Sequence, residues 1–234
     1  MVRHDECMAH TGIGTLNENP LHAALKDWYA RPGDRFEEPV AGYLVDIVRG
    51  DLAIEIQTAA FAAIRAKLRA LVSARPVRLV YPIAHEKWIV RLDGDGPDIL
   101  GRRRSPRRGS VTDVFEELVS IAALPADPNF SLHLVLAREE EVRRYDGRLG
   151  RWRHGWVVSE RRLLGVLDDR LFERPADFCE LLPRGLAEPF TTADLARAGG
   201  INRRRAQQMA YCLRKMGVLS PVGRSRDGIL HLRA

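Results

Sequence analysis

Apolar residues recur along the first half of the chain with two different periods, which predict alternating helices and strands. Helical spacing marks Pro20 to about Tyr29 and Phe61 to Val72. Shorter apolar runs typical of strands lie between and after these helices, at 36–40, 43–48, 52–58, 77–83, 88–92 and 98–103. The order helix, strands, helix, strand predicts an α/β (α+β) layer domain rather than a helical bundle or a β-sandwich.

The pattern divides the chain into three parts. Residues 1–14 have no period and are predicted to be flexible. Residues 15–174 are predicted to form the α/β domain, with a further helix at about 112–123 and a strand at 130–137; whether 110–174 complete this domain or connect it to the next stays open. Residues 138–153 carry mixed charges and are predicted to be exposed. Residues 175–234 are predicted to form a second, smaller domain.

The second domain shows helix signals followed by strand signals. Thr191 and Asp194 form a capping-box-like start for a helix over 192–198, and Asn202 can cap a helix that runs to about Met216. Along the latter helix, apolar residues form one stripe that reads as core, and polar residues occupy the other side. Strands are predicted at 218–222 and 229–232, joined by a basic tip.

The most informative pattern in the first domain is a hairpin around Gly50 and Asp51. If these two residues form the turn, Asp46 lies directly opposite Glu55, and Gln57 joins them on the same face of the sheet. The other face is then wholly apolar and consists of Val45, Ile47, Leu52, Ile54 and Ile56. The hairpin therefore brings two carboxylates and one amide together above a hydrophobic layer.

This arrangement allows two interpretations. Carboxylates that face each other repel, and a bridging divalent cation removes that repulsion. Hard oxygen ligands that stay open to water and phosphate suit Mg²⁺, which can assist phosphate hydrolysis. The alternative is a solvent-facing hairpin with ordinary charged residues, and the spacing alone leaves both interpretations open.

The run GYLVDIVRGDLAIEIQT, with a helix on each side and the strand VRLVYPI after it, resembles the PD-(D/E)XK nuclease superfamily. That superfamily includes restriction enzymes and Holliday-junction resolvases. The resemblance covers about residues 15–92 and implies a restriction-endonuclease-like core with a mixed sheet flanked by helices. It assigns Asp46 and Glu55 to metal binding and catalysis, with Mg²⁺ (or Mn²⁺) as cofactor.

Gln57 occupies the position where the superfamily pattern has lysine, although some members also carry glutamine there. Glutamine can only hydrogen-bond, so the cation would have to come from Lys67 or Lys26. The superfamily often adds a glutamate on the first helix, and Glu18 is the best match. Glu18, His22 and Lys26 share a helix face if the helix starts early, and the acids Glu37 and Glu38 compete for this role.

Charge distinguishes the C-terminal region from the rest of the chain. The 234 residues include 37 basic side chains for a net charge of +6, and only four of the 37 are lysines. Residues 197–234 contain nine basic side chains and one acidic side chain. Arginine suits phosphate recognition, so this cluster predicts a nucleic-acid face; genome base composition explains the dispersed arginines equally well.

The order helix, helix, turn, helix, hairpin over about residues 176–233 resembles a winged helix-turn-helix domain. The resemblance implies DNA contact by the polar face of the last helix and by the hairpin tip. The expected DNA-binding residues are Arg203, Arg204, Arg205, Gln207, Gln208, Arg224 and Arg226. The alternative for this domain is a protein-contact module.

Taken together, the patterns predict a Mg²⁺-dependent DNA endonuclease or a related DNA-processing hydrolase. The alternatives are a non-catalytic DNA-binding regulator on an inactive nuclease-like scaffold and, third, a protein adaptor. DNA is the expected partner, and a homodimer stays open. No apolar run reaches the roughly 18 residues of a membrane helix, so no membrane contact is expected. Three distant cysteines (Cys7, Cys179 and Cys212) argue against a disulfide framework and favour the cytoplasm.

Overall fold

The structure is a computed structural model of the chain and describes residues 19–93, 96, 98–145 and 155–234. The segment predicted to be flexible (1–14), Glu18 and Cys7 lie outside the described residues. Seven strands form one sheet: β1 (Arg35–Val40), β2 (Tyr43–Arg49), β3 (Leu52–Ile56), β4 (Val77–Leu92), β5 (Ile99–Arg104), β6 (Phe130–Tyr145) and β7 (Trp156–Phe172).

The sheet is mixed. Its strand order is β1-β2-β3-β4-β6-β7, and β5 pairs with the C-terminal residues 88–92 of β4. Strand β4 runs parallel to both β3 and β6, whereas the remaining pairs are antiparallel. The helix α2 (Phe61–Val72) makes the crossover between the parallel strands β3 and β4, and a chain of short helical segments makes the crossover between β4 and β6. The molecule is therefore an α+β protein with a mixed sheet flanked by helices.

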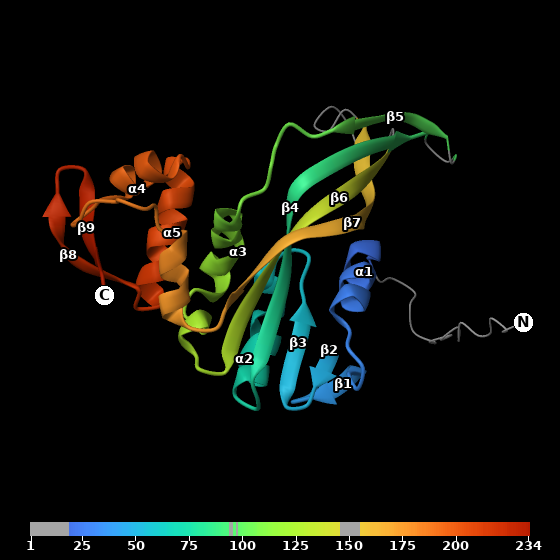
Figure 1. Ribbon diagram of the computed structural model, residues 1–234, viewed down its shortest axis with the longest axis horizontal. Helices are drawn as coiled ribbons and strands as arrows, with labels where there is room; N and C mark the ends of the chain where they lie inside the picture. Colours follow the sequence, from blue (N-terminus) through green and yellow to red (C-terminus); the bar gives the residue numbers. More distant parts are fainter. Residues whose placement is uncertain (1–18, 94–95, 97, 146–154) are drawn as a thin grey trace, which may run out of the picture.

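Helices cover both faces of the sheet (Figure 1). The helix α1 (Pro20–Tyr29), capped by Asn19 as predicted, lies on one face, where Leu21 and Leu25 pack against Ile47 and Ile54. On the other face lie α2 and the short segments η1 (Val111–Val114), α3 (Phe115–Leu118), η2 (Val119–Ile121) and η3 (Leu124–Ala126). The hairpin of β2 and β3 is thus enclosed between α1 and α2.

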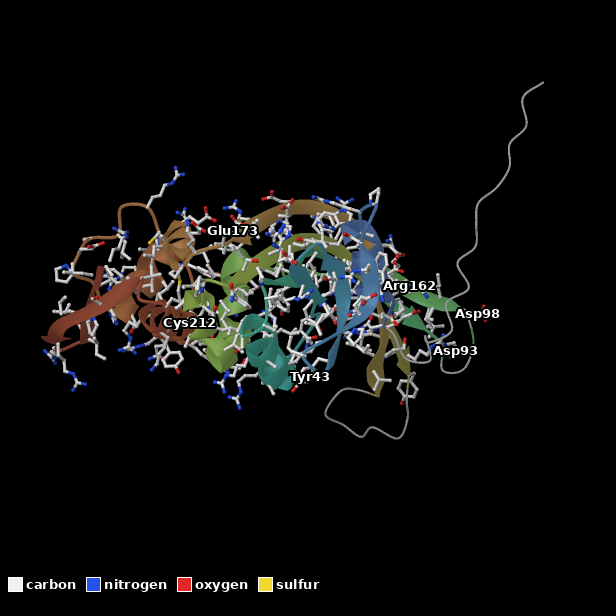
Figure 2. The ribbon with its side chains drawn as sticks, turned by 90° about the horizontal axis from the view of Figure 1, so that it is seen from below. Tyr43, Asp93, Asp98, Arg162, Glu173 and Cys212 are labelled. Atoms are coloured by element: carbon white, nitrogen blue, oxygen red, sulfur yellow. The ribbon has the colours of Figure 1, made fainter. Side chains whose placement is uncertain are left out.

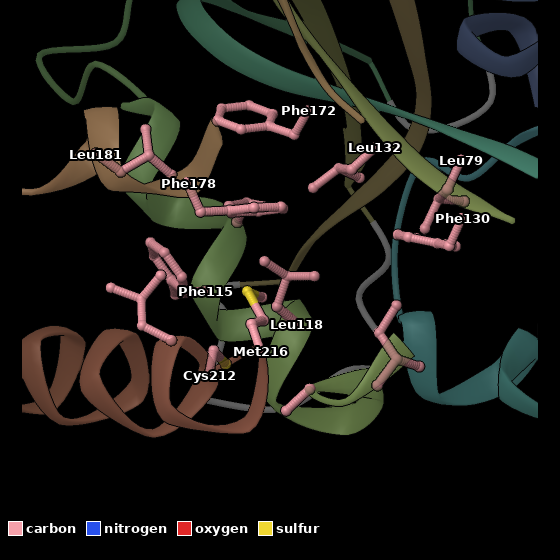
Figure 3. Close-up of a cluster of buried hydrophobic side chains, with 14 of the residues drawn as sticks. Leu79, Phe115, Leu118, Phe130, Leu132, Phe172, Phe178, Leu181, Cys212 and Met216 are labelled. Atoms are coloured by element: carbon pink, nitrogen blue, oxygen red, sulfur yellow. The ribbon is translucent and has the colours of Figure 1, made fainter. Parts of the chain in front are cut away.

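The C-terminal part contains η5 (Pro175–Leu181), α4 (Thr192–Gly199), α5 (Arg203–Lys215) and a two-stranded sheet of β8 (Leu219–Ser225) and β9 (Gly228–Arg233). It lies at one end of the molecule, where Figure 2 labels Cys212, and the tip of the β4–β5 hairpin with Asp93 and Asp98 lies at the other end. Its hydrophobic core continues into the core of the larger sheet, as Figure 3 shows. Phe172 of β7 stacks on Phe178 of η5 with ring centroids 4.6 Å apart.

An ion cluster also joins the C-terminal part to the sheet domain. Arg205 of α5 is only 8% exposed and donates to the carboxylates of Asp113 in η1 and Glu116 in α3, the latter at 3.2 Å. Because a buried arginine needs acidic partners, this contact fixes how α5 is rotated against α3. The described part of the chain contains no helix that is both long and apolar enough to cross a membrane.

Most predicted elements of the first domain are confirmed, including the hairpin of β4 and β5. The helix expected at 112–123 is instead a helical path broken into the short segments η1, α3 and η2. Residues 138–145, predicted to be exposed, extend β6, and Glu139 and Glu141 are buried there. Arg161 of β7 pairs with Glu139, and Lys87 of β4 pairs with Glu141, so the sheet buries these charges as ion pairs.

Candidate active site

The hairpin of β2 and β3 has the register that the sequence predicts. The pairs Arg49–Leu52, Val48–Ala53 and Ile47–Ile54 follow from a turn at Gly50 and Asp51. The pairing stops there, one pair before the level at which Asp46 and Glu55 would face each other. Beyond that point the Asp46 carboxylate accepts a hydrogen bond from the Ile56 backbone N–H at 2.7 Å, so a side chain replaces the missing ladder bond.

The expectation that Val45 shares a wholly apolar face with Ile47, Ile54 and Ile56 is wrong. Val45 packs in the core cluster on the α2 side, while the three isoleucines pack toward α1. The cause is an irregularity at Asp46: the opposite residue of β1, Glu37, has a φ of 52°, which non-glycine residues rarely adopt. Distorted strands of this kind re-aim a side chain, and here they turn the Asp46 carboxylate toward the end of β3.

Glu55 is the acidic residue at the end of β3, and it is only 4% exposed. The alternative of a solvent-facing hairpin is therefore wrong at this position. Lys67 of α2 donates to Glu55 Oε1, because α2 crosses above β3 and directs this side chain down to the strand. Glu55 Oε2 is buried and has no hydrogen-bond partner among the described residues. One oxygen of a buried carboxylate is thus available to a further ligand.

His22 of α1 contacts the other carboxylate, with its Nε2 at 3.3 Å from Asp46 Oδ2. Four elements therefore deliver one side chain each: α1 gives His22, β2 gives Asp46, β3 gives Glu55 and α2 gives Lys67. Each acid is paired with one potential cation, Asp46 with His22 and Glu55 with Lys67. The four mostly buried side chains form a compact charge cluster.

The two acids differ in their protonation. Burial and the nearby charge of Asp46 raise the pKa of Glu55 to about 7, although Lys67 and His22 oppose this rise. Burial also disfavours ionised Asp46, but the contact with His22, the Ile56 N–H and the charge of Lys67 outweigh it and hold the pKa of Asp46 below its usual value. Near neutral pH, Asp46 is ionised while Glu55 is poised between its two forms.

The other residues considered for the site lie apart from this cluster. The Gln57 side-chain amide donates to the carbonyls of Ala59 and Ala60 and shapes the turn into α2, where Ala60 has a φ of 48°. Lys26 pairs with Glu37 at 3.2 Å. Glu38, which competes with Glu18 for the role of the superfamily's helix glutamate, lies on β1 and pairs with Arg35 at 3.8 Å. Glu18 lies outside the described residues.

The described residues contain no group of three or more histidine, cysteine or acidic side chains that could hold a metal ion by themselves. The donor set of Asp46 and Glu55 suits a hard cation that keeps several water molecules and needs only one or two carboxylates. The buried, unpartnered Glu55 Oε2 and the raised pKa of Glu55 both mark a place where added positive charge would be favourable. The residues present therefore fit Mg²⁺ or Mn²⁺.

A family model for a domain of unknown function, DUF8091, matches residues 19–173. The chain belongs to the DUF8091 family. An uncharacterized protein of Treponema pallidum (strain Nichols) is 32% identical over 212 residues, which cover 89% of this chain and 82% of that protein. No solved structure matches the chain significantly. The DUF8091 region contains the whole cluster of His22, Asp46, Glu55 and Lys67, so the candidate site belongs to the part that defines the family.

The residues expected to bind DNA lie beyond the DUF8091 region. Arg203, Arg204 and Gln207 are exposed on α5, Gln208 is partly buried, and Arg224 and Arg226 are exposed at the β8–β9 hairpin. Arg205 departs from the expectation, because it is buried and held by Asp113 and Glu116. A signal for its burial exists in the sequence: Arg205 precedes Met209 by four residues and therefore lies on the apolar side of the helix.

Sequence reasoning named Lys67 only as one of two candidates for the missing cation, and the structure places it at Glu55. Two signals favour Lys67 over Lys26. Lysine is rare in a chain with 33 arginines, and Lys67 follows Ile64 by three residues on the inner side of α2. Its partner could not be read from the sequence, because the contact depends on how α2 docks on β3.

Proposed function

We propose that the protein is a Mg²⁺-dependent DNA endonuclease, or a closely related DNA phosphodiester hydrolase, with its active site at Asp46, Glu55 and Lys67. The observation that carries the proposal is the buried Glu55 carboxylate, which is paired with Lys67 through one oxygen and unpartnered at the other. An unpartnered oxygen alone does not mark such a site, because Glu139 Oε1 is also buried without a partner beside its ion pair with Arg161. Glu55 differs in having a second carboxylate, Asp46, close enough for its charge to raise the pKa of Glu55. The incomplete pairing next to a second carboxylate is what a hydrolytic metal site requires.

In this proposal Asp46 and Glu55 would hold the ion, which supplies Lewis-acid stabilisation of the charge that develops on the phosphate. Hydrolysis joins a water oxygen to phosphorus and breaks one ester bond, whose oxygen takes up a proton. Lys67 is held at the site by Glu55 and can donate a hydrogen bond to the attacking water or to a phosphate oxygen. It thereby takes the part that the superfamily pattern gives to the lysine at the position of Gln57. His22 contributes, with the Ile56 N–H and Lys67, to lowering the pKa of Asp46.

We further propose that the sheet domain is a restriction-endonuclease-like core and that the C-terminal part is a winged helix-turn-helix domain. The support is the succession of α4, α5 and the β8–β9 hairpin, with basic side chains exposed on α5 and on the hairpin. Arg203, Arg204 and Gln207 would read the major groove, and Arg224 and Arg226 would contact phosphates. We leave Arg205 out of this DNA-binding set because it holds α5 to α3.

The direct test is metal-dependent nicking of supercoiled plasmid by the full-length protein, with Mg²⁺ or Mn²⁺ against EDTA. Asp46→Asn keeps the size of the side chain and removes its charge, and we expect it to lower the nicking rate on the order of 100-fold, or ~2.7 kcal/mol. The matched control is Asp51→Asn, in the exposed turn of the same hairpin, which should nick like the parent. Equal nicking by both variants, with folding verified by circular dichroism, would remove the site.

One observation favours a second function, a DNA-binding regulator without catalysis. Lys67 already neutralises Glu55, and the Gln57 amide is committed to the turn before α2, so the cluster could also serve as a structural link between the hairpin and α2. This alternative predicts salt-sensitive binding of duplex DNA and no metal-dependent cleavage under any ionic condition.

A further inference from the structure

A groove lies between α2 and α5, two helices far apart in the sequence. Its volume is about 450 Å³, and the connecting segment 119–124 forms its floor. Arg65 and Arg69 line one wall from α2, and Tyr211 and Lys215 line the other wall from α5. In each pair the residues are four positions apart, so both side chains project from the same side of their helix. Two rows of polar side chains therefore border the groove.

The groove is positively charged. Among the residues that line it, Asp127 is the one acid, against the three cations Arg65, Arg69 and Lys215. Within the described ranges none of these three cations is ion-paired with a carboxylate. Some arginines elsewhere are paired with acids, as Arg49 is with Asp34, and others such as Arg107 and Arg108 have no ion pair among the described residues. Unpaired cations gathered around a concave surface attract a polyanion, and the guanidinium fork matches phosphate oxygens.

The groove also continues the exposed face of α5. Because Arg205 is held by Asp113 and Glu116 on the buried side of the helix, the opposite side is fixed toward solvent. Spacings of three and four residues give that side one exposed stripe, which consists of Arg204, Gln207, Tyr211 and Lys215. The last two residues of this stripe, Tyr211 and Lys215, line the groove. Tyr211 is 39% exposed and offers a ring face to a base or sugar as well as a hydroxyl to a phosphate.

We propose that the groove between α2 and α5 binds the phosphodiester backbone of DNA, with Arg65, Arg69 and Lys215 on phosphates and Tyr211 beside them. The inference deepens the proposed function, on which it rests for the identity of the DNA as substrate. Lys67 lies two residues from Arg65 and thus on the opposite side of α2. The width of α2, on the order of 10 Å, would therefore separate a phosphate in the groove from the Glu55–Lys67 pair.

The test is fluorescence anisotropy with the full-length protein and a labelled DNA duplex in EDTA, so that binding is measured without cleavage. Arg69→Glu and Lys215→Glu are the test variants, alone and combined. The matched control is Arg31→Glu, an exposed arginine that follows α1 on the opposite face of the sheet. We expect the combined variant to weaken binding at least tenfold and to lower the slope of log Kd against log salt by about two.

Conservative variants keep the result interpretable if charge reversal disturbs folding. Arg69→Gln and Lys215→Gln should each lower the slope of log Kd against log salt by about one while the melting temperature stays unchanged.

The proposal is overturned if Arg31→Glu weakens binding as much as the groove variants, or if polyglutamate of equal charge displaces the duplex as well as unlabelled DNA does. Binding that depends on the groove, without any metal-dependent nicking, would refute the nuclease function and retain the groove. Metal-dependent nicking, with DNA binding unchanged in the groove variants, would support the nuclease function and refute the groove.

Discussion

Two buried glutamates of the same sheet show how differently an acid can be enclosed. Glu55 on β3 is 4% exposed and Glu141 on β6 is 6% exposed, and a lysine pairs with each. Glu141 has both oxygens occupied, by Lys87 at 2.9 Å and by Arg143 at 2.7 Å. Burial disfavours its charge, but these two cations outweigh burial and hold the pKa of Glu141 below its usual value.

At Glu55 the pKa shifts in the opposite direction. Burial and the second acid, Asp46, outweigh Lys67, the one cation of the described residues that contacts it, and the weaker effect of His22, so the pKa of Glu55 rises to about 7. Glu141 therefore stabilises the folded protein in its ionised form, whereas ionised Glu55 destabilises it. The comparison separates a completed structural ion pair from a site that still lacks positive charge, and this difference supports a functional role for Glu55.

The largest expected effect concerns activity. In the plasmid-nicking assay, Glu55→Gln should lose on the order of 100- to 1,000-fold in rate, because a neutral amide is a poor ligand for a hard cation. Glu141→Gln changes the same residue type at similar burial but outside the site, and it should retain activity within a few-fold wherever it is folded. An equal loss in both variants would show that Glu55 acts only through stability.

The second effect concerns stability against pH, where the two glutamates should have opposite slopes. Folded Glu55 binds its proton up to about pH 7, whereas the unfolded chain releases it near its ordinary pKa of 4.5, so the free energy of unfolding falls as pH rises through this window. Glu55→Gln removes the fall and should raise the free energy of unfolding at about pH 8 by up to about 3 kcal/mol. Urea denaturation at about pH 5 and about pH 8 measures the difference.

Glu141→Gln should do the opposite. Because the pKa of Glu141 is lowered in the folded state, its stabilisation is present above the unfolded pKa and is lost only as pH falls. Removing this charge leaves Lys87 and Arg143 without a carboxylate, and the variant should be less stable than the parent by about 1–3 kcal/mol at neutral pH. A gain in stability from this substitution would contradict the comparison.

The third effect concerns metal binding. Mg²⁺ must displace the proton that Glu55 carries below pH 7, so its affinity should rise about tenfold between about pH 6 and about pH 8. Mg²⁺ should raise the melting temperature of the parent and of Glu141→Gln by a few degrees at the higher pH, and that of Glu55→Gln not at all.

The smallest effect concerns His22. His22→Asn withdraws the contact that lowers the pKa of Asp46. The Ile56 N–H and the charge of Lys67 still oppose the effect of burial, so we expect Asp46 to remain ionised at neutral pH. We expect less than about a threefold change in the nicking rate at neutral pH and a larger loss toward acid pH. A rate loss as large as that of Asp46→Asn would instead give His22 a direct role in catalysis.

The sequence predicts the part of this site that lies on one hairpin, but not the contacts made by residues from other elements. Gly50 and Asp51 fix the register of the hairpin, and with it the neighbourhood of Asp46 and Glu55, because a two-residue turn leaves little choice of pairing. The contact of Lys67 with Glu55 depends on helix docking, which no local pattern specifies. The irregular strand at Glu37, which moves Val45 to the α2 side, has no recognised sequence signal either.

Contacts between residues far apart in the sequence also explain why the burial of charged residues in β6 and of Arg205 was not predicted. The charged residues of β6 and β7 mislead a pattern-based prediction, because each buried acid is neutralised by a partner far away in sequence, as Glu139 is by Arg161. The apolar stripe of α5 predicts which side of the helix is packed, but it does not show that Asp113 and Glu116 would hold an arginine there. Arg205 was therefore expected at DNA, although it secures the helix to Asp113 and Glu116.

The stacked rings of Phe172 and Phe178 have a practical consequence for anyone who trims this protein. The family region ends at residue 173, between the two rings, so a fragment that stops there would present Phe172 and the neighbouring apolar side chains of α3 to water. Such a fragment should aggregate rather than fold autonomously. Expression of the sheet domain therefore requires that the C-terminal part be left attached.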